Sequence, residues 1–116
     1  MFNGRLKITV FKAKGLQLTS LMAYTHGPSA LIDPYVVIDV DNISIDRTSN
    51  RFETCDPEWN ESFKTEILRD AEELNFTVFN STTSSFIANC KISLSDCLTR
   101  NKDGFWVNFT NAFKNT

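Results

Sequence analysis

The length of 116 residues allows one domain with a hydrophobic core and is too short for two. Hydrophobic residues make up 41% of the chain and charged residues 22%, which are the proportions of an ordinary globular domain. The formal net charge of −2 argues against a nucleic-acid binder or a strongly polybasic membrane binder, and no stretch approaches the length of a membrane span.

Alternating apolar and polar residues predict short β-strands along the whole chain. Leu6, Ile8 and Val10 form the first alternation, and a mixed loop over 17–32 follows it. The Asp33-Pro34 pair then enforces a bend before a run rich in β-branched residues. The segments with strand character are 5–10, 33–40, 43–47, 59–67, 74–79, 86–94 and 105–109. We expect single helical turns in 69–73 and 95–98.

These seven segments have the spacing of a β-sandwich, and no helical stretch of core length interrupts them. The three cysteines, Cys55, Cys90 and Cys97, are an odd number without a Cys-x-x-Cys pair, so reduced thiols in a cytosolic protein are the simple interpretation. The N-terminus passes straight into a strand pattern and offers no apolar signal segment. We therefore predict a cytoplasmic, all-β, single domain over residues 1–116.

Four motifs together resemble those of a C2 domain. They are Phe2-Asn3-Gly4-x-Leu6-Lys7-Ile8, Asp33-Pro34-Tyr35, Pro57-x-Trp59-Asn60-Glu61-x-Phe63 and Phe86-Ile87-Ala88-Asn89-Cys90. More narrowly, the chain resembles the N-terminal C2 domain of the calcium-independent (novel) protein kinase C enzymes, the epsilon and eta branch. The resemblance extends from residue 2 to residue 109, and the strand expected after Trp106-Val107 has no clear match.

This resemblance implies an eight-stranded antiparallel β-sandwich of the C2 fold with type II topology, whose final strand is missing or altered. It also implies a non-catalytic regulatory module at the head of a serine/threonine kinase. Such domains dock on membranes or protein partners through the loops at one end of the sandwich.

Calcium binding by a C2 domain requires about five aspartates from two loops, because this hard cation takes several oxygen ligands. Asp33 matches one of these positions. The segment 17–32 holds no acidic residue, and neither does 75–95, where Asn80, Ser81 and Thr82 stand in place of the paired aspartates. We therefore predict no metal site, and we expect Asp33 to cap the loop by accepting backbone N–H groups.

Apolar side chains in two loops are candidates for membrane insertion. They are Leu21, Met22, Tyr24, Leu31 and Ile32 in the first loop, and Phe86 and Ile87 beside the second. Packing beneath the loops as core is the alternative, and it is favoured for Leu31, Ile32, Phe86 and Ile87. For the other three the two interpretations stay open.

Arg47 and Arg51 form a candidate basic contact, but Asp46, Glu53 and Asp56 lie near them and favour a charge-balanced, solvated face. His26 is the only histidine, and no nucleophile, phosphate loop or kinase motif accompanies it, so we predict no catalytic residue. Trp59 and Trp106 occupy strand positions, where core packing is favoured over ligand stacking.

The predicted function is a regulatory and targeting domain that binds anionic phospholipid membranes weakly, without calcium, and docks protein partners or the rest of the kinase. The alternative is a protein-interaction or autoinhibitory module with no lipid role. We expect a monomer that is cytoplasmic and peripheral to membranes, without a cofactor and without nucleic acid as a partner.

Overall fold

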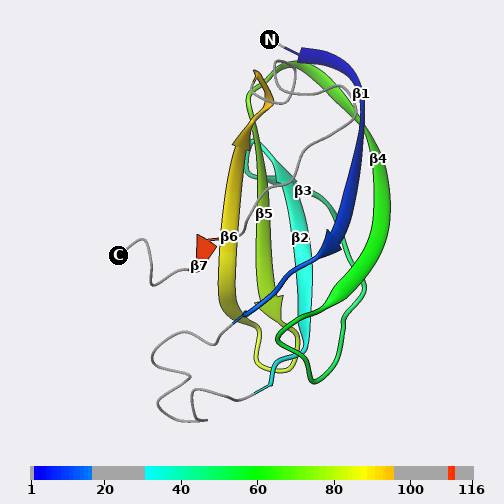
Figure 1. The fold of residues 1–116 in the computed structure, drawn as a ribbon. Helices are drawn as coiled ribbons and strands as arrows, with labels where there is room; N and C mark the ends of the chain where they lie inside the picture. The colour runs from blue at the N-terminus through cyan, green and yellow to red at the C-terminus, as the bar shows by residue number, and fades with distance from the viewer. Residues whose placement is uncertain (1, 17–30, 96–109, 112–116) are drawn as a thin grey trace.

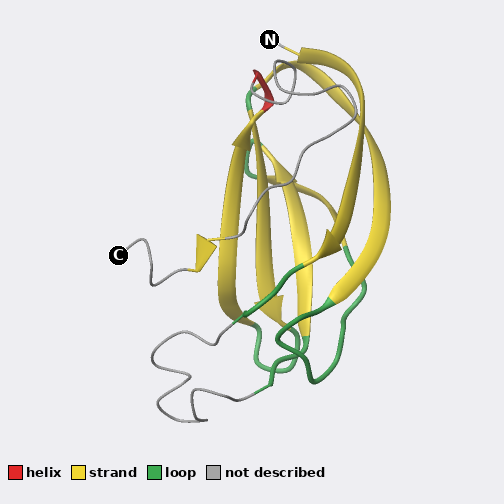
Figure 2. Cartoon of the chain, viewed as in Figure 1, coloured by secondary structure: helices red, strands yellow, loops and turns green. Residues whose placement is uncertain are grey.

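The computed structural model describes residues 2–16, 31–95 and 110–111, which form two antiparallel β-sheets (Figures 1 and 2). One sheet pairs β1 (Phe2–Lys12) with β4 (Glu58–Ala71). The other has the strand order β3-β2-β5-β6-β7. Its strands are β2 (Pro34–Val40), β3 (Ile43–Arg47), β5 (Glu73–Asn80), β6 (Ser85–Ser93) and β7 (Thr110–Asn111).

The core lies between the two sheets and follows the alternation of each strand. In β2, Val36 and Ile38 are fully buried, and β5 places Val78 and Phe76 opposite them. From the other sheet, Ile8 and Trp59 pack into the same cluster. The strands β1, β2, β4, β5 and β6 therefore contribute buried apolar side chains to this core, as expected for a sandwich.

Three connections meet at one end of the sandwich (Figure 1), and we call this end the loop end. Its described parts are residues 13–16 and 31–33 of the β1–β2 connection, 48–57 and 81–84. Backbone hydrogen bonds join them, since Thr54 donates to the Ile32 carbonyl at 2.9 Å and Ser81 donates to the Asp33 carbonyl at 2.8 Å. The β2–β3 turn lies at the opposite end, where Asp41 and Asn42 have positive φ angles of 48° and 70°.

The helical turn predicted in 69–73 is wrong, because residues 69–71 continue β4 and Glu73 begins β5. A distant carboxylate stabilises the corner, since Asp41 accepts the backbone N–H groups of Glu72 and Glu73. The predicted strand over 105–109 and most of the predicted turn over 95–98 lie outside the described residues. The pairing of Phe2 with Ala71 shows how far β4 extends.

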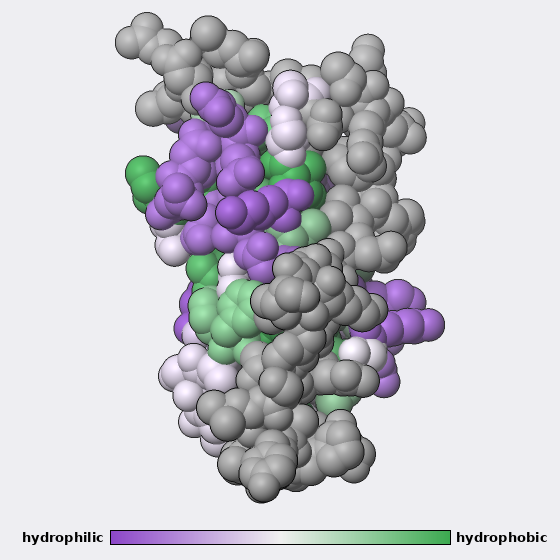
Figure 3. All heavy atoms as spheres, turned by 90° about the vertical axis from the view of Figure 1, so that its left-hand side faces the viewer, coloured by the Kyte–Doolittle hydropathy of each residue, from purple (hydrophilic) through white to green (hydrophobic). Residues whose placement is uncertain are grey.

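Hydrophilic side chains gather over the upper part of the face that carries β6 and β7, with smaller apolar areas between them (Figure 3). Within the ranges that the structure describes, no helix has the length and apolar character needed to cross a membrane.

Candidate functional site

Asp33 joins the three connections that meet at the loop end. Its carboxylate accepts the backbone N–H of Glu53 at 2.7 Å and the hydroxyl of Thr82. Its own backbone N–H donates to Asn80 Oδ1 at 3.0 Å. The residue is therefore a cap that holds the entrance of β2 against the other two connections, as the sequence predicted.

Hydrogen bonds from Thr82 and then from the Glu53 N–H lower the pKa of the Asp33 carboxyl, and partial burial opposes them. Both donors stabilise the charged form, and each of them comes from another connection of the loop end. Among the described residues there is no cluster of three His, Cys, Asp or Glu side chains that could hold a metal ion. A lone carboxylate with neutral neighbours is a poor ligand set for a divalent cation.

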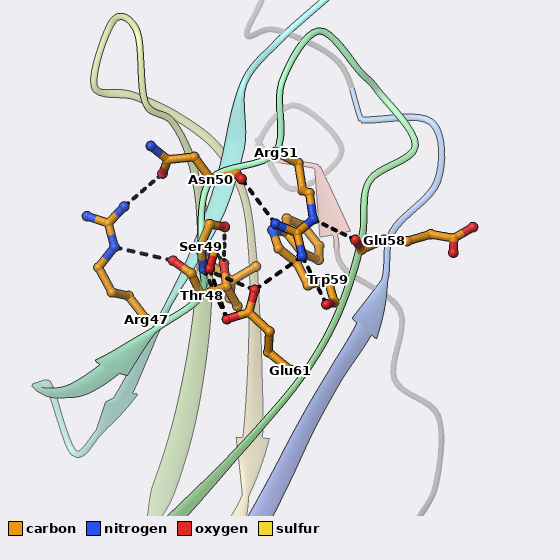
Figure 4. Close-up of polar contacts among 9 residues, drawn as sticks. Arg47, Thr48, Ser49, Asn50, Arg51, Glu58, Trp59 and Glu61 are labelled. Carbon is orange, nitrogen blue, oxygen red and sulfur yellow. Dashed lines mark hydrogen bonds and ion pairs between the residues drawn. The ribbon is translucent and has the colours of Figure 1, made fainter.

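Arg51 holds the 48–57 connection against β4 (Figure 4). Its guanidinium donates to the backbone carbonyls of Glu58 at 2.8 Å and Trp59 at 3.1 Å. It also pairs with the Glu61 carboxylate at 3.4 Å. The sequence suggested that Asp46, Glu53 and Asp56 balance the charge of the two arginines. The ion pair of Arg51 is instead with Glu61.

Arg47 lies apart from Arg51, on the β3 side of the connection (Figure 4). Its guanidinium carbon lies 3.7 Å from the centroid of the Tyr35 ring, and its Nη2 donates to Asn50 Oδ1 at 2.8 Å. Arg47 is exposed, whereas Arg51 is half-buried and fully engaged with β4. The two arginines that the sequence grouped therefore do not form one basic patch, and Arg47 is the more accessible charge.

The apolar candidates separate by burial. Ile32 and Ile87 are 1% and 0% exposed, which confirms the core interpretation for both and excludes Ile87 as an insertion tip. Leu31 is 59% exposed, so its expected place in the core is wrong. The reason is that the in–out alternation of β2 already holds in the residues just before the strand, where Ile32 is buried and the preceding residue is exposed. Phe86 is half-buried, with its ring edge-to-face against Phe79 at 6.4 Å.

Phe52 is the residue that sequence reasoning missed. It is 70% exposed and lies in the 48–57 connection, whose composition is otherwise mostly polar. The sequence signal that could have indicated its exposure is a single aromatic residue within a polar loop. The first-loop candidates Leu21, Met22 and Tyr24 lie outside the described residues, as does His26.

The thiols of the described part have no features of nucleophiles. Burial raises the pKa of Cys90, and burial followed by the nearby Asp56 charge raises the pKa of Cys55. Both thiols are protonated at neutral pH and do not supply a reactive thiolate.

Two facing antiparallel sheets with connections gathered at one end define an antiparallel β-sandwich. The model of the C2 domain family matches residues 4–109, and the chain belongs to this family. Protein kinase C of Drosophila melanogaster is 40% identical over 93% of this chain, and protein kinase C eta type of Rattus norvegicus is 34% identical over 84%. These matches confirm the resemblance to the protein kinase C branch.

The matched segment is a small part of those relatives. The chain spans 16% and 15% of their respective lengths, which is about a sixth. Solved structures with the same fold include a pair of C2 domains from Extended-Synaptotagmin 2, with a TM-score of 0.68 and 23% identity over 84% of this chain and 30% of that one. A C2 domain of RIM from Drosophila has a TM-score of 0.62 and 24% identity, over 80% of this chain and 77% of that one.

Proposed function

We propose that this C2 domain is a non-catalytic targeting module that attaches to anionic phospholipid membranes without calcium. The observation that carries the proposal is the hydrogen bonding of Asp33, whose carboxylate accepts from Glu53 and Thr82 inside the domain. A calcium-dependent domain uses such a carboxylate as a metal ligand beside several others. Here the loop end is held together by hydrogen bonds that need no ion.

Exposed apolar side chains at the loop end support membrane contact. Phe52 is 70% exposed and Leu31 is 59% exposed, and both belong to connections that the Thr54–Ile32 hydrogen bond joins. Full burial of a side chain of this size contributes about 1.5–3 kcal/mol, so two such residues give weak and reversible attachment. We also propose Leu21, Met22 and Tyr24, together with the half-buried Phe86, as membrane contacts.

Arg47 is the basic contact that we favour, because its guanidinium is exposed, whereas Arg51 is engaged with β4. One or two cationic groups near the surface contribute about 1 kcal/mol each with anionic lipid. A net charge of −2 disfavours purely electrostatic attachment, so the apolar contact provides the larger part. The domain would thus bind weakly, as a cytoplasmic monomer at the membrane periphery.

The relatives extend the proposal to the whole protein. Because protein kinase C enzymes match over nearly the entire chain, we infer that the domain regulates a serine/threonine kinase, with the catalytic part elsewhere. Within such a protein, the domain would also dock on protein partners or on the rest of the kinase.

Vesicle co-sedimentation tests the lipid role. The unmodified 116-residue chain is mixed with phosphatidylserine–phosphatidylcholine vesicles in calcium or in a chelator, and we expect equal binding in both. Phe52→Ala should weaken the binding about tenfold, the equivalent of about 1.4 kcal/mol. Ile43→Ala is the matched control, since Ile43 is 69% exposed at the opposite end of the sandwich. Binding that requires calcium, or equal losses in both variants, would contradict the proposal.

The second candidate is a protein-interaction or autoinhibitory module with no lipid role. It is favoured by the exposed edge strand β3, which borders the five-stranded sheet in the described part and carries Ile43. Edge strands offer backbone groups to a partner strand. Absence of vesicle binding in every condition, together with binding to the separately purified kinase region that Ile43→Asp abolishes, would support this candidate instead.

A further inference from the structure

Ser49 presents an exposed hydroxyl between two arginines, in the sequence Arg47-Thr48-Ser49-Asn50-Arg51. The neighbouring Thr48 has no such access, because it is 2% exposed. Its hydroxyl accepts the N–H of Val36 at 2.9 Å and donates to the Ser49 carbonyl at 3.0 Å. Of the two adjacent hydroxyl residues, Ser49 alone is available to another protein.

Ser49 shares the carboxylate of Glu61 with Arg51 (Figure 4). The Ser49 N–H lies 3.2 Å from both Glu61 carboxylate oxygens, and its Oγ lies 3.4 Å from Oε1. Arg51 Nη2 lies 3.4 Å from Oε2 of the same side chain. One negative charge therefore balances one guanidinium, and the Ser49 hydroxyl is directly beside this pair.

We propose that Ser49 is a phosphorylation site for an arginine-directed serine/threonine kinase, and that the phosphate replaces Glu61 as the partner of Arg51. Cationic side chains two residues before and two residues after the hydroxyl suit a kinase whose peptide subsites are acidic. In the reaction, the Ser49 oxygen bonds to the γ-phosphorus of ATP as the bond from that phosphorus to the β,γ-bridging oxygen breaks. ADP leaves with the electron pair, and the hydroxyl proton passes to the kinase's general base.

The modification changes the charge balance of the connection. Phosphoserine carries about −1.5 to −2 charges at neutral pH and presents three strong acceptor oxygens. Beside the Glu61 carboxylate it is repelled, and it attracts the guanidinium of Arg51 away from the carbonyls of Glu58 and Trp59. The connection that carries Phe52 then loses the contacts that Arg51 makes with the β4 carbonyls.

A consequence for membranes rests on the proposed function above. Added negative charge beside Arg47 and Phe52 repels an anionic surface at the place where the domain would contact it. We expect phosphorylation to weaken vesicle binding at least fivefold, so that the site acts as an electrostatic switch.

The test uses the 116-residue chain, ATP and a purified arginine-directed kinase, with intact mass and fragment mass spectrometry as readouts. We expect one phosphate per chain, located on Ser49, and none in Ser49→Ala. Arg47→Gln should slow incorporation at least tenfold, because it removes one recognition charge without touching the Arg51 contacts. Ser62→Ala is the matched control, since Ser62 is an exposed serine without flanking arginines and its loss should change nothing.

Two results would overturn the proposal. One is labelling at Thr48 or elsewhere that persists in Ser49→Ala. The other is labelling of a peptide covering residues 44–54 without labelling of the folded domain, because the fold would then withhold the site. Vesicle binding is measured on both forms of the chain. Failure of the unmodified chain to bind contradicts the proposed function alone, whereas equal binding by both forms contradicts only the switch.

Discussion

Replacing Asp33 by alanine tests whether hydrogen bonds hold the loop end together. The change removes the acceptor for the Glu53 N–H and for the Thr82 hydroxyl. Hydrogen bonds to a charged group contribute about 1.5–3 kcal/mol when buried, and partial exposure reduces each of these two to about 1 kcal/mol. We therefore expect the free energy of unfolding to fall by about 2 kcal/mol, or a melting temperature lower by about 8 °C in a domain of this size.

The same carboxylate makes stability depend on pH. Because the folded pKa of Asp33 is lowered by Thr82 and the Glu53 N–H, its contribution is present above the unfolded pKa, which is about 3.9. The contribution is lost as the pH falls through the lower folded pKa. In Asp33→Asn the amide keeps an acceptor for Glu53, so we expect a loss of about 1 kcal/mol at neutral pH. The difference from the original chain should shrink in acid.

Urea unfolding followed by tryptophan fluorescence measures these losses, since Trp59 is buried in the core. Asp46→Ala is the control, because the Asp46 carboxylate contacts the backbone of its own neighbour Arg47, and its loss should cost less than about 0.5 kcal/mol. Equal stability of Asp33→Ala and Asp46→Ala would refute the stabilising role of the Asp33 cap. A melting temperature that rises in millimolar calcium and depends on Asp33 would refute the hydrogen-bonded interpretation of the loop end.

Two further changes test the division between core and surface. Ile87→Ala should lower the free energy of unfolding by about 2–5 kcal/mol in urea titrations, because its side chain is fully buried, and a loss below about 1 kcal/mol would contradict that placement. Arg51→Lys should cost about 1–2 kcal/mol in the same assay, because an ammonium group cannot reach both β4 carbonyls and Glu61 together. Arg47→Lys, which changes the contacts of an exposed side chain with Tyr35 and Asn50, should cost no more than about 1 kcal/mol.

The strands could be predicted from the sequence because alternation reports burial directly. The run after Asp33 was expected over 33–40 and forms β2 from Pro34 to Val40. Val36 and Ile38, two residues apart on one face of this run, are both fully buried. The cap by Asp33 could also be predicted, because an aspartate before proline without acidic partners has few other roles.

The remaining features depend on contacts between residues that lie far apart in the chain. The corner between β4 and β5 is stabilised by Asp41, and nothing in the charged segment 69–73 itself indicates this contact. The partner of Arg51 is Glu61 on the following strand, whereas proximity in sequence suggested closer acidic residues. Local composition also concealed Phe52, because a polar connection gives no periodicity from which exposure can be predicted.

The hydrogen-bonded loop end has a consequence for regulation. A metal-dependent loop end is unsaturated without its ion, so the ion can switch membrane attachment by neutralising the carboxylates. In this domain the Asp33 carboxylate accepts hydrogen bonds from Glu53 and Thr82, so two of the connections are joined by contacts that involve no ion. Under the proposed function, attachment must then be changed by something that alters the surface charge. The exposed hydroxyl of Ser49, beside the Arg51–Glu61 pair, is where a single added phosphate would have that effect.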